Sequence, residues 1–111
     1  MITMDHILNE FGLSSREMNE VFRVLRAYPQ ITLVHIFGSR AKGTFHKGSD
    51  IDLAIMNGDV DTKIVEQLNS AFDESSLPFT VDLVQYHKLT NDSLKAHIDR
   101  VGKVFYQTQA A

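Results

Sequence analysis

The sequence predicts a small α/β (α+β) domain, in which a mixed sheet of about three strands packs on helices in the order αβαβαβα. Three observations predict this class. Apolar runs rich in β-branched residues alternate with segments whose apolar residues recur at helical spacing. Turn signals such as Asn57-Gly58 separate the two kinds of segment. A length of 111 residues suits a single domain over 1–111 with one hydrophobic core.

The first helix is expected to begin near Arg16. Ser14 or Ser15 can cap it, and Glu17 stands three positions after Ser14, which is the spacing of a capping box. The dipeptide Tyr28-Pro29 ends the helix, because a residue before proline is disfavoured in helical conformation.

The next three elements surround a polar loop. The apolar, β-branched run 31–37 predicts a buried strand, which Gly38-Ser39 ends. A short helix is expected over 40–42, and the polar stretch 44–48 predicts a loop. A second strand follows over 50–56.

The second half of the chain repeats the alternation. Helical spacing returns after Asp61, which can cap the segment, and again after Thr90 or Asn91. Between these helices the run 79–86 predicts a third strand. The short apolar stretch 104–106 is expected to pack on the sheet or a helix, or to contact a partner.

Composition excludes several classes of protein. The net charge of −3 argues against direct nucleic-acid binding, which usually needs a basic surface. The absence of cysteine excludes disulfides and cysteine-based zinc sites. The N-terminus does not have the pattern of a signal peptide, and no apolar stretch approaches the length of a membrane span. We therefore expect a cytoplasmic protein that does not contact membranes.

Two aspartates at the start of the second strand carry the strongest chemical signal. Side chains two apart on a strand point to the same face, so Asp50 and Asp52 project together. Asp82 lies between apolar neighbours on the third strand, and the three carboxylates converge if those two strands are adjacent. Such a cluster of like charges is tolerable when cations neutralise it, and all-oxygen ligation suits Mg²⁺ or Mn²⁺.

The Gly38-Ser39 pair offers the complementary half of a site. A strand that ends in glycine and enters a helix exposes backbone N–H groups, which suit phosphate. Gly38 allows close approach of the backbone, the Ser39 hydroxyl is a further donor, and Arg40 can add positive charge. Carboxylates that hold metals opposite a phosphate cradle describe a site for displacement at phosphorus.

The combined motif resembles a known superfamily. A Gly-Ser pair, ten residues, an Asp-x-Asp pair and a later Asp are similar to the nucleotidyltransferases related to DNA polymerase beta. At this length the chain resembles their minimal nucleotidyltransferase (MNT) branch, the antitoxins of HEPN/MNT toxin–antitoxin pairs. The resemblance is strongest over 31–86.

The resemblance implies both roles and a reaction. It makes Asp50, Asp52 and Asp82 the catalytic metal ligands, and Gly38 and Ser39 binders of the nucleoside triphosphate, with Arg40 and Ser49 beside them. It implies transfer of AMP from ATP, with Mg²⁺ or Mn²⁺, to a tyrosine of a HEPN toxin. The expected assembly is a hetero-oligomer with that toxin, and a homodimer is a second candidate.

Two other functions remain open at this stage. The chain can be an antitoxin that neutralises its partner by binding alone, or an enzyme that acts on a small molecule. The motif favours an enzyme that transfers AMP to a protein over an antitoxin that only binds. A decayed site would be expected to lose Ser39 or one of the three aspartates, and all four residues are present. Activity is also expected to depend on a second chain that completes the pocket.

Overall fold

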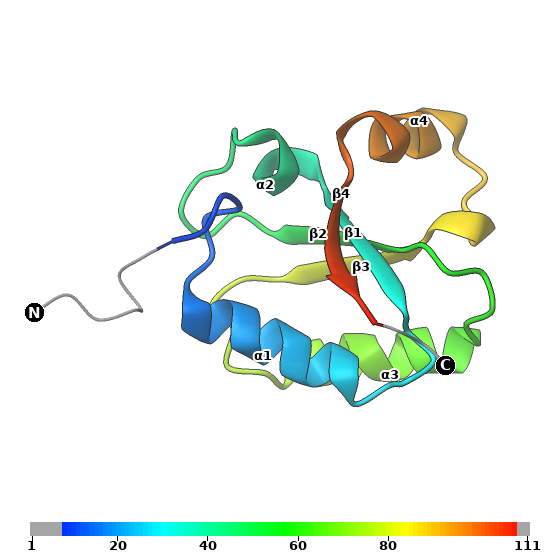
Figure 1. Cartoon of the computed structure of the whole chain (residues 1–111), viewed down its shortest axis with the longest axis horizontal. Coiled ribbons are helices and arrows are strands. Elements are labelled where there is room, and N and C mark those ends of the chain that lie inside the picture. The colour runs from blue at the N-terminus through cyan, green and yellow to red at the C-terminus, as the bar shows by residue number, and fades with distance from the viewer. Residues whose placement is uncertain (1–7, 109–111) are drawn as a thin grey trace, which may run out of the picture.

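The computed structural model describes residues 8–108, and within them a four-stranded mixed sheet is packed on four helices (Figure 1). The 3-10 turn Tyr86–Lys88 lies between β3 and α4. In chain order the elements are α1 (Ser15–Arg26), β1 (Leu33–Phe37), α2 (Gly38–Lys42), β2 (Ile51–Ile55), α3 (Thr62–Asp73), β3 (Val81–Gln85), α4 (Asp92–Val101) and β4 (Lys103–Gln107).

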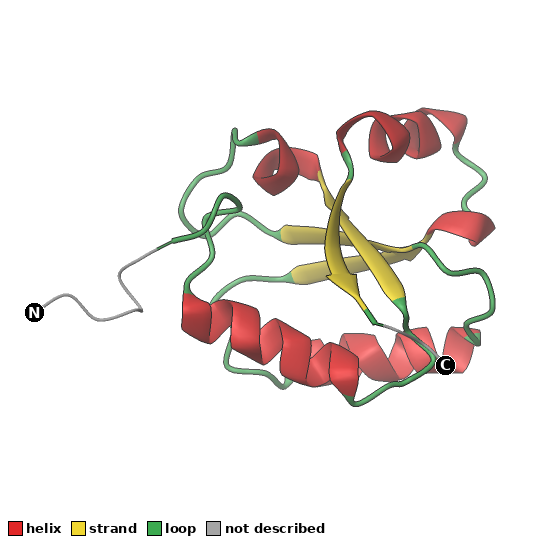
Figure 2. Cartoon of the chain, viewed as in Figure 1, coloured by secondary structure: helices red, strands yellow, loops and turns green. Residues whose placement is uncertain are grey.

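The sheet has the strand order β3-β2-β1-β4. β1 pairs antiparallel with both β2 and β4, whereas β2 and β3 run parallel (Figure 2). The expectation of about three strands is one too few, because β4 was predicted only as an apolar tail. Its side chains at Lys103 and Val104 are exposed at the sheet edge, so the segment lacks the continuous apolar run of the buried strands.

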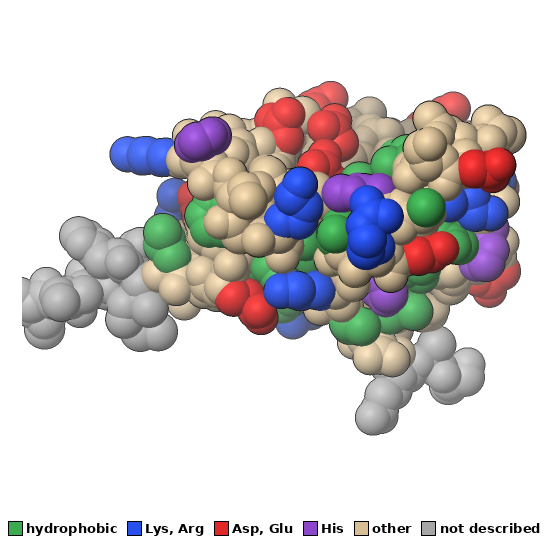
Figure 3. Space-filling view, turned by 90° about the horizontal axis from the view of Figure 1, so that it is seen from above, with side chains coloured by type: hydrophobic (Ala, Val, Ile, Leu, Met, Phe, Trp, Pro, Cys, Tyr) green, Lys and Arg blue, Asp and Glu red, His purple; other side chains and the backbone are tan. Residues whose placement is uncertain are grey.

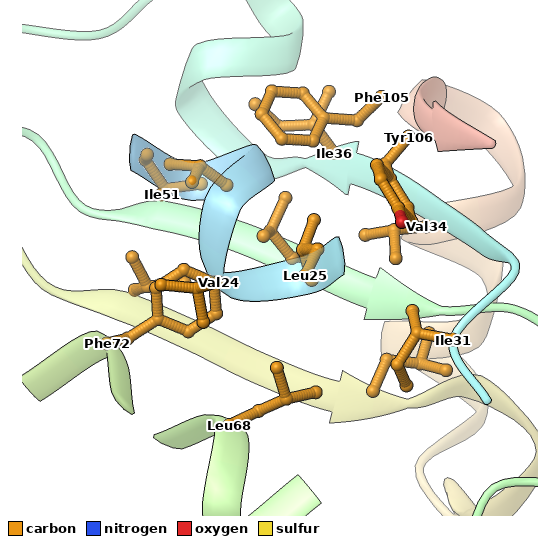
Figure 4. Packing of buried hydrophobic residues seen from close by; sticks show 14 of the residues in the cluster. Val24, Leu25, Ile31, Val34, Ile36, Ile51, Leu68, Phe72, Phe105 and Tyr106 are labelled. Atoms are coloured by element: carbon orange, nitrogen blue, oxygen red, sulfur yellow. The ribbon is translucent and has the colours of Figure 1, made fainter. Parts of the chain in front are cut away.

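The two faces of the sheet are covered by different helices. α1 and α3 lie on one face, and α2 and α4 lie on the other (Figure 1). The main core fills the space between the sheet and the first pair of helices (Figure 4). A smaller apolar cluster around Phe37, Ala54 and Ile98 holds α4 on the opposite face. None of the helices in the described part of the chain has both the length and the apolar character needed to cross a membrane.

The helix boundaries follow the capping residues that the sequence predicts. The Ser14 hydroxyl accepts from the Glu17 backbone N–H (3.1 Å), and the Glu17 carboxylate accepts from the Ser14 N–H (2.9 Å). The Asp61 and Asn91 side chains cap α3 and α4 by accepting from the N–H groups of Lys63 and Leu94. One boundary differs: α2 begins at Gly38 and not at Arg40, so the glycine that ends β1 also opens the helix.

Candidate active site

The parallel pairing of β2 and β3 places Asp52 directly opposite Asp82. Both side chains are on the face of the sheet that carries α2 and α4, because their neighbours Ile51 and Leu53 are fully buried on the other face. Adjacent strands lie about 4.8 Å apart, so two carboxyl groups in this register are neighbours. The two strands predicted to bring these aspartates together are therefore adjacent, as the three-carboxylate interpretation requires.

Gly38 lies immediately beside the Asp52 carboxylate. Phe37 is the register partner of Asp52, so the next residue reaches the end of β2 where that side chain emerges. A Cβ added to Gly38 would stand 2.2 Å from Asp52 Oδ2, far inside contact distance, and Gly38 has a φ of 72°, which side chains disfavour. Only glycine fits this junction of β1, α2 and the carboxylate.

The close packing of carboxylates changes the protonation of Asp52. Burial raises the pKa of Asp52 from an ordinary 3.8 to about 6, and the charges of Asp82 and Asp50 and a hydrogen bond with Asp82 act in the same direction. Neither of the two ion pairs within residues 8–108 involves these three aspartates. Their negative charge is therefore not neutralised by a basic side chain of this part of the protein.

Asp50 completes the group from the loop and not from the strand. β2 begins at Ile51, so Asp50 is the last residue of the connection from α2, and its side chain is exposed. Residues 8–108 contain no ready-made cage of three or more Asp, Glu, His or Cys side chains. The site is instead a contacting pair, Asp52 and Asp82, with a third carboxylate close enough to act on the pair by its charge.

The donor set fits a hard divalent cation. All three groups offer carboxylate oxygens, which Mg²⁺ and Mn²⁺ prefer, and the surplus negative charge would be offset by such an ion. Mg²⁺ usually keeps several waters and binds through one or two carboxylates together with substrate phosphates, so an incomplete protein cage is the expected form of the site. Acidic side chains gather on the surface that carries α2 and α4, with basic ones around them (Figure 3).

The first turn of α2 faces this carboxylate group. The first N–H groups of a helix have no partner within it, and here they belong to the turn opened by Gly38 and Ser39, beside Asp52. The Ser39 carbonyl accepts from the N–H groups of Gly43 and Thr44, which closes the short helix behind it. The predicted phosphate-binding pair and the predicted metal ligands are thus brought to one end of the sheet.

Arg40 and Ser49, which are expected beside the nucleotide, both make hydrogen bonds within the protein. The Arg40 side chain is only 3% exposed, and its guanidinium donates to backbone carbonyls of Phe11, Gly12 and Ser49. The Ser49 hydroxyl accepts from the His46 N–H (2.7 Å) and shapes the loop. Both residues therefore support the loop that leads to Asp50, and a contact of either one with the nucleotide stays a prediction.

The residues that surround Arg40 were not predicted from the sequence. The Arg40 guanidinium lies over the rings of Phe45 and Phe79. Gly12 lies against the Phe45 ring. Gly12 has a φ of 73°, and an added Cβ would meet that ring at 2.2 Å. The contact joins segments far apart in sequence, so no local pattern predicts it.

Comparison with known proteins places the chain among nucleotidyltransferases. It matches the family described as Polymerase beta, Nucleotidyltransferase over residues 19–111. The Probable protein adenylyltransferase MntA of Haemophilus influenzae is 36% identical over 84 residues, covering 75% of this chain and 74% of that protein. The Protein adenylyltransferase MntA of Shewanella oneidensis is 32% identical over 92 residues, covering 82% of this chain and 66% of that protein.

Two solved structures share the fold over most of the chain. One is a toxin–antitoxin with AMP-PNP, with a TM-score of 0.58 and 32% identity over 83% of this chain and 74% of the other. The second is the tri-AMPylated Shewanella oneidensis HEPN toxin in complex with MNT antitoxin, with a TM-score of 0.52 and 28% identity over 83% and 71% of the two chains. Sequence and fold agree: the chain belongs to the polymerase beta nucleotidyltransferase family and is a homologue of the MntA minimal nucleotidyltransferases.

Proposed function

We propose that this protein is a metal-dependent nucleotidyltransferase that transfers AMP from ATP to a hydroxyl of a partner protein. The acceptor we propose is a tyrosine of a HEPN toxin, so that the protein acts as an antitoxin by modifying its partner. The observation that carries the proposal is the contact of the Asp52 carboxylate with Gly38 on one side and Asp82 on the other. This contact supports a site in which proposed metal ligands lie beside the turn that would bind phosphate.

The relatives supply the chemical class of the reaction. Both MntA relatives are protein adenylyltransferases by name, one of them as a probable one, and one related solved complex contains AMP-PNP. In another, an MNT antitoxin is bound to an AMPylated HEPN toxin. ATP as the substrate and a HEPN protein as the acceptor are the readings that agree with both the site and these relatives.

Each group in the site has a role in this reaction. The N–H groups at Gly38 and Ser39 and the Ser39 hydroxyl would hold the triphosphate, while Asp50, Asp52 and Asp82 would hold Mg²⁺ or Mn²⁺. The bound cation would offset charge on the phosphates and on the leaving pyrophosphate.

The displacement itself is simple in its bonds. The acceptor oxygen forms a bond to the α-phosphorus as the bond from that phosphorus to the bridging oxygen of pyrophosphate breaks, with the two oxygens in line. The hydroxyl proton leaves to a nearby base, and we assign this position to Asp82. Its side chain is exposed, so it can meet a group that arrives from outside the chain.

The openness of the site agrees with a protein acceptor. Asp50 and Asp82 are exposed, and the group lies on the surface between α2 and the ends of β2 and β3. A hydroxyl carried by another folded chain can therefore approach. The requirement for ATP places the reaction in the cytoplasm.

The test is transfer of label from α-labelled ATP to the HEPN partner in the presence of Mg²⁺. We expect the wild type to label the partner and Asp52→Ala to lose at least about 100-fold of the rate, as for removal of a group that stabilises transition-state charge. Asp73→Ala is the matched control, because Asp73 is an exposed aspartate at the end of α3 on the opposite face. A wild type that neutralises the partner without labelling it, as effectively as Asp52→Ala does, would sink the enzyme in favour of neutralisation by contact.

A further inference from the structure

Arg40 is the one charged side chain that the structure buries within residues 8–108. Its guanidinium has no carboxylate partner there, because the ion pairs of these residues involve other side chains. Burial lowers the pKa of Arg40, and the charges of Glu17 and Asp50 act in the opposite direction. Arginine nevertheless stays protonated in proteins, so a buried cation is maintained at this point.

Backbone carbonyls and aromatic rings take the place of a counter-ion. Nε and Nη2 donate to the Ser49 carbonyl (3.0 and 2.8 Å), and Nη1 donates to the carbonyls of Phe11 (2.9 Å) and Gly12 (3.2 Å). The guanidinium carbon lies 4.8 Å from the Phe79 ring centroid and 5.4 Å from that of Phe45. These distances are those of cation–π contacts, which add to the hydrogen bonds.

The Ser49 carbonyl connects Arg40 to the residue that carries the third carboxylate. That carbonyl belongs to the peptide bond that joins Ser49 to Asp50, and two N–H groups of Arg40 hold it. Arg40 itself is on α2, two residues after Gly38 and one after Ser39. The Arg40 side chain therefore links the helix turn that would hold the phosphates directly to the peptide bond of the residue that carries the third carboxylate.

The peptide bonds on the two sides of Asp50 are held by different partners: Arg40 binds the Ser49 carbonyl, and the Ile51 N–H donates to the Thr80 carbonyl (2.9 Å). The connection from α2 to β2 is irregular, and its remaining hydrogen bonds, from Thr44 to Ser39 and between His46 and Ser49, do not involve Asp50. The Asp50 side chain is exposed and is not fixed by packing. Without the guanidinium, the loop end would be anchored to α2 only through the chain.

From these contacts we infer that Arg40 is a positioning residue that sets Asp50 for metal and nucleotide binding, a role that rests on the proposed function. It acts through the backbone of Asp50 and does not touch the nucleotide. The buried fork geometry makes arginine necessary, because a lysine ammonium cannot span the carbonyls of Ser49, Phe11 and Gly12 together.

The test is a calorimetric titration of the full-length protein with Mn²⁺ and AMP-PNP. Arg40→Lys keeps the charge and loses the fork, and we expect binding to weaken about 10-fold, the usual size of an effect from the residues that orient metal ligands. Val65→Ala is the matched control for lost stability, because Val65 is buried on α3, on the other side of the sheet. It should bind within about twofold of the wild type, since distant sites act independently. Urea titrations identify conditions in which each variant is folded.

A double-mutant cycle separates positioning from a direct contact. If Arg40 acts through Asp50, then Asp50→Asn weakens binding by itself, and adding Arg40→Lys to it causes no further loss. Additive losses would overturn the proposal, as would an Asp50→Asn that binds normally. Equal binding by Arg40→Lys and the wild type would overturn it too and leave Arg40 with a purely structural role.

Two further outcomes keep the test decisive. Should Arg40→Lys not fold, Phe45→Leu takes its place, because it removes one ring from the guanidinium and leaves its hydrogen bonds; it should weaken binding several-fold, and normal binding would contradict the proposal. A wild type that does not bind Mn²⁺ and AMP-PNP would contradict the proposed function itself. If the wild type binds and Arg40→Lys binds equally well, only the role proposed for Arg40 is contradicted.

Discussion

Gly38 and Asp52 constrain one another at the scale of single residues. Position 38 has to be glycine because an added Cβ would stand 2.2 Å from Asp52 Oδ2. The Asp52 carboxylate is held there by the register of Asp52 opposite Phe37. A change at either residue therefore alters the other.

Gly38→Ala should cost activity beyond its effect on the backbone. Gly43 offers a matched control, because it has a similar positive φ (81° against 72°) and nothing within 4 Å of an added Cβ. Both alanines pay the strain of that conformation, about 1–2 kcal/mol of the free energy of unfolding. Only Gly38→Ala displaces Asp52, so we expect it alone to lose about 100-fold or more of AMP transfer, measured at equal folded fraction. Equal activity of the two variants would contradict the contact.

Asp52 also makes stability depend on pH. Its pKa is raised to about 6 in the folded state, so the folded protein holds this proton more tightly than the unfolded chain does. The associated stability is fully present below about pH 4 and is lost as the pH rises through about 6. Above that range the ionised carboxylate destabilises the metal-free protein.

Asp52→Asn should therefore stabilise the metal-free protein while it abolishes transfer. We expect a gain of about 1 kcal/mol in the free energy of unfolding at pH 7.5, since the group is partly exposed and screened by solvent, and no gain at pH 4. Urea titration in EDTA at the two pH values measures it. A variant that is less stable than the wild type at pH 7.5 would show that burial and the neighbouring charges do not destabilise the ionised Asp52 carboxylate as described.

The residues of the site differ in how far sequence predicts them. Asp50 and Asp52 were predictable from their spacing, because a strand alternates its faces with period two. The burial of Arg40 was not, because its partners Phe11 and Gly12 lie 29 and 28 residues earlier in the chain. Surface charge is the ordinary expectation for arginine, and only the folded chain reveals the carbonyls that hold it.

At the scale of elements, local chemistry predicts the first residue of a helix better than it predicts the limits of a strand. Ser14, Asp61 and Asn91 cap α1, α3 and α4 because their side chains accept from N–H groups that the helix leaves free. β1 begins two residues after the predicted start at Ile31, since strand ends depend on what the neighbouring strand offers for pairing. The formation of β4 depends in the same way on pairing with β1, and the residues of β4 alone do not predict a strand.

The order of the strands is the element-level fact on which the site depends. Asp82 faces Asp52 only because β3 lies next to β2 in parallel, with the two aspartates in register. The parallel connection runs through α3, whose apolar side packs on the core. Spacing within the sequence places each aspartate on its strand, and tertiary packing alone decides that the two strands meet.

At the scale of the whole molecule, the two faces of the sheet have separate tasks. The face under α1 and α3 is apolar and holds most of the core (Figure 4). The opposite face is only partly covered by α4, and the part left open carries the carboxylates beside α2. Stability is concentrated on one side, so the other side can keep like charges close together, as sites of catalysis commonly do.

The central claim is that the start of α2 and the starts of β2 and β3 form one nucleotide site. A crystal structure of the protein with AMP-PNP and Mn²⁺, with the metal located by its anomalous scattering, tests it most directly. We predict metal density within about 2.0–2.3 Å of oxygens of Asp52 and Asp82, with the triphosphate on the N–H groups at Gly38 and Ser39. Density for the nucleotide and the metal elsewhere on the protein, with these carboxylates left bare, would contradict the account.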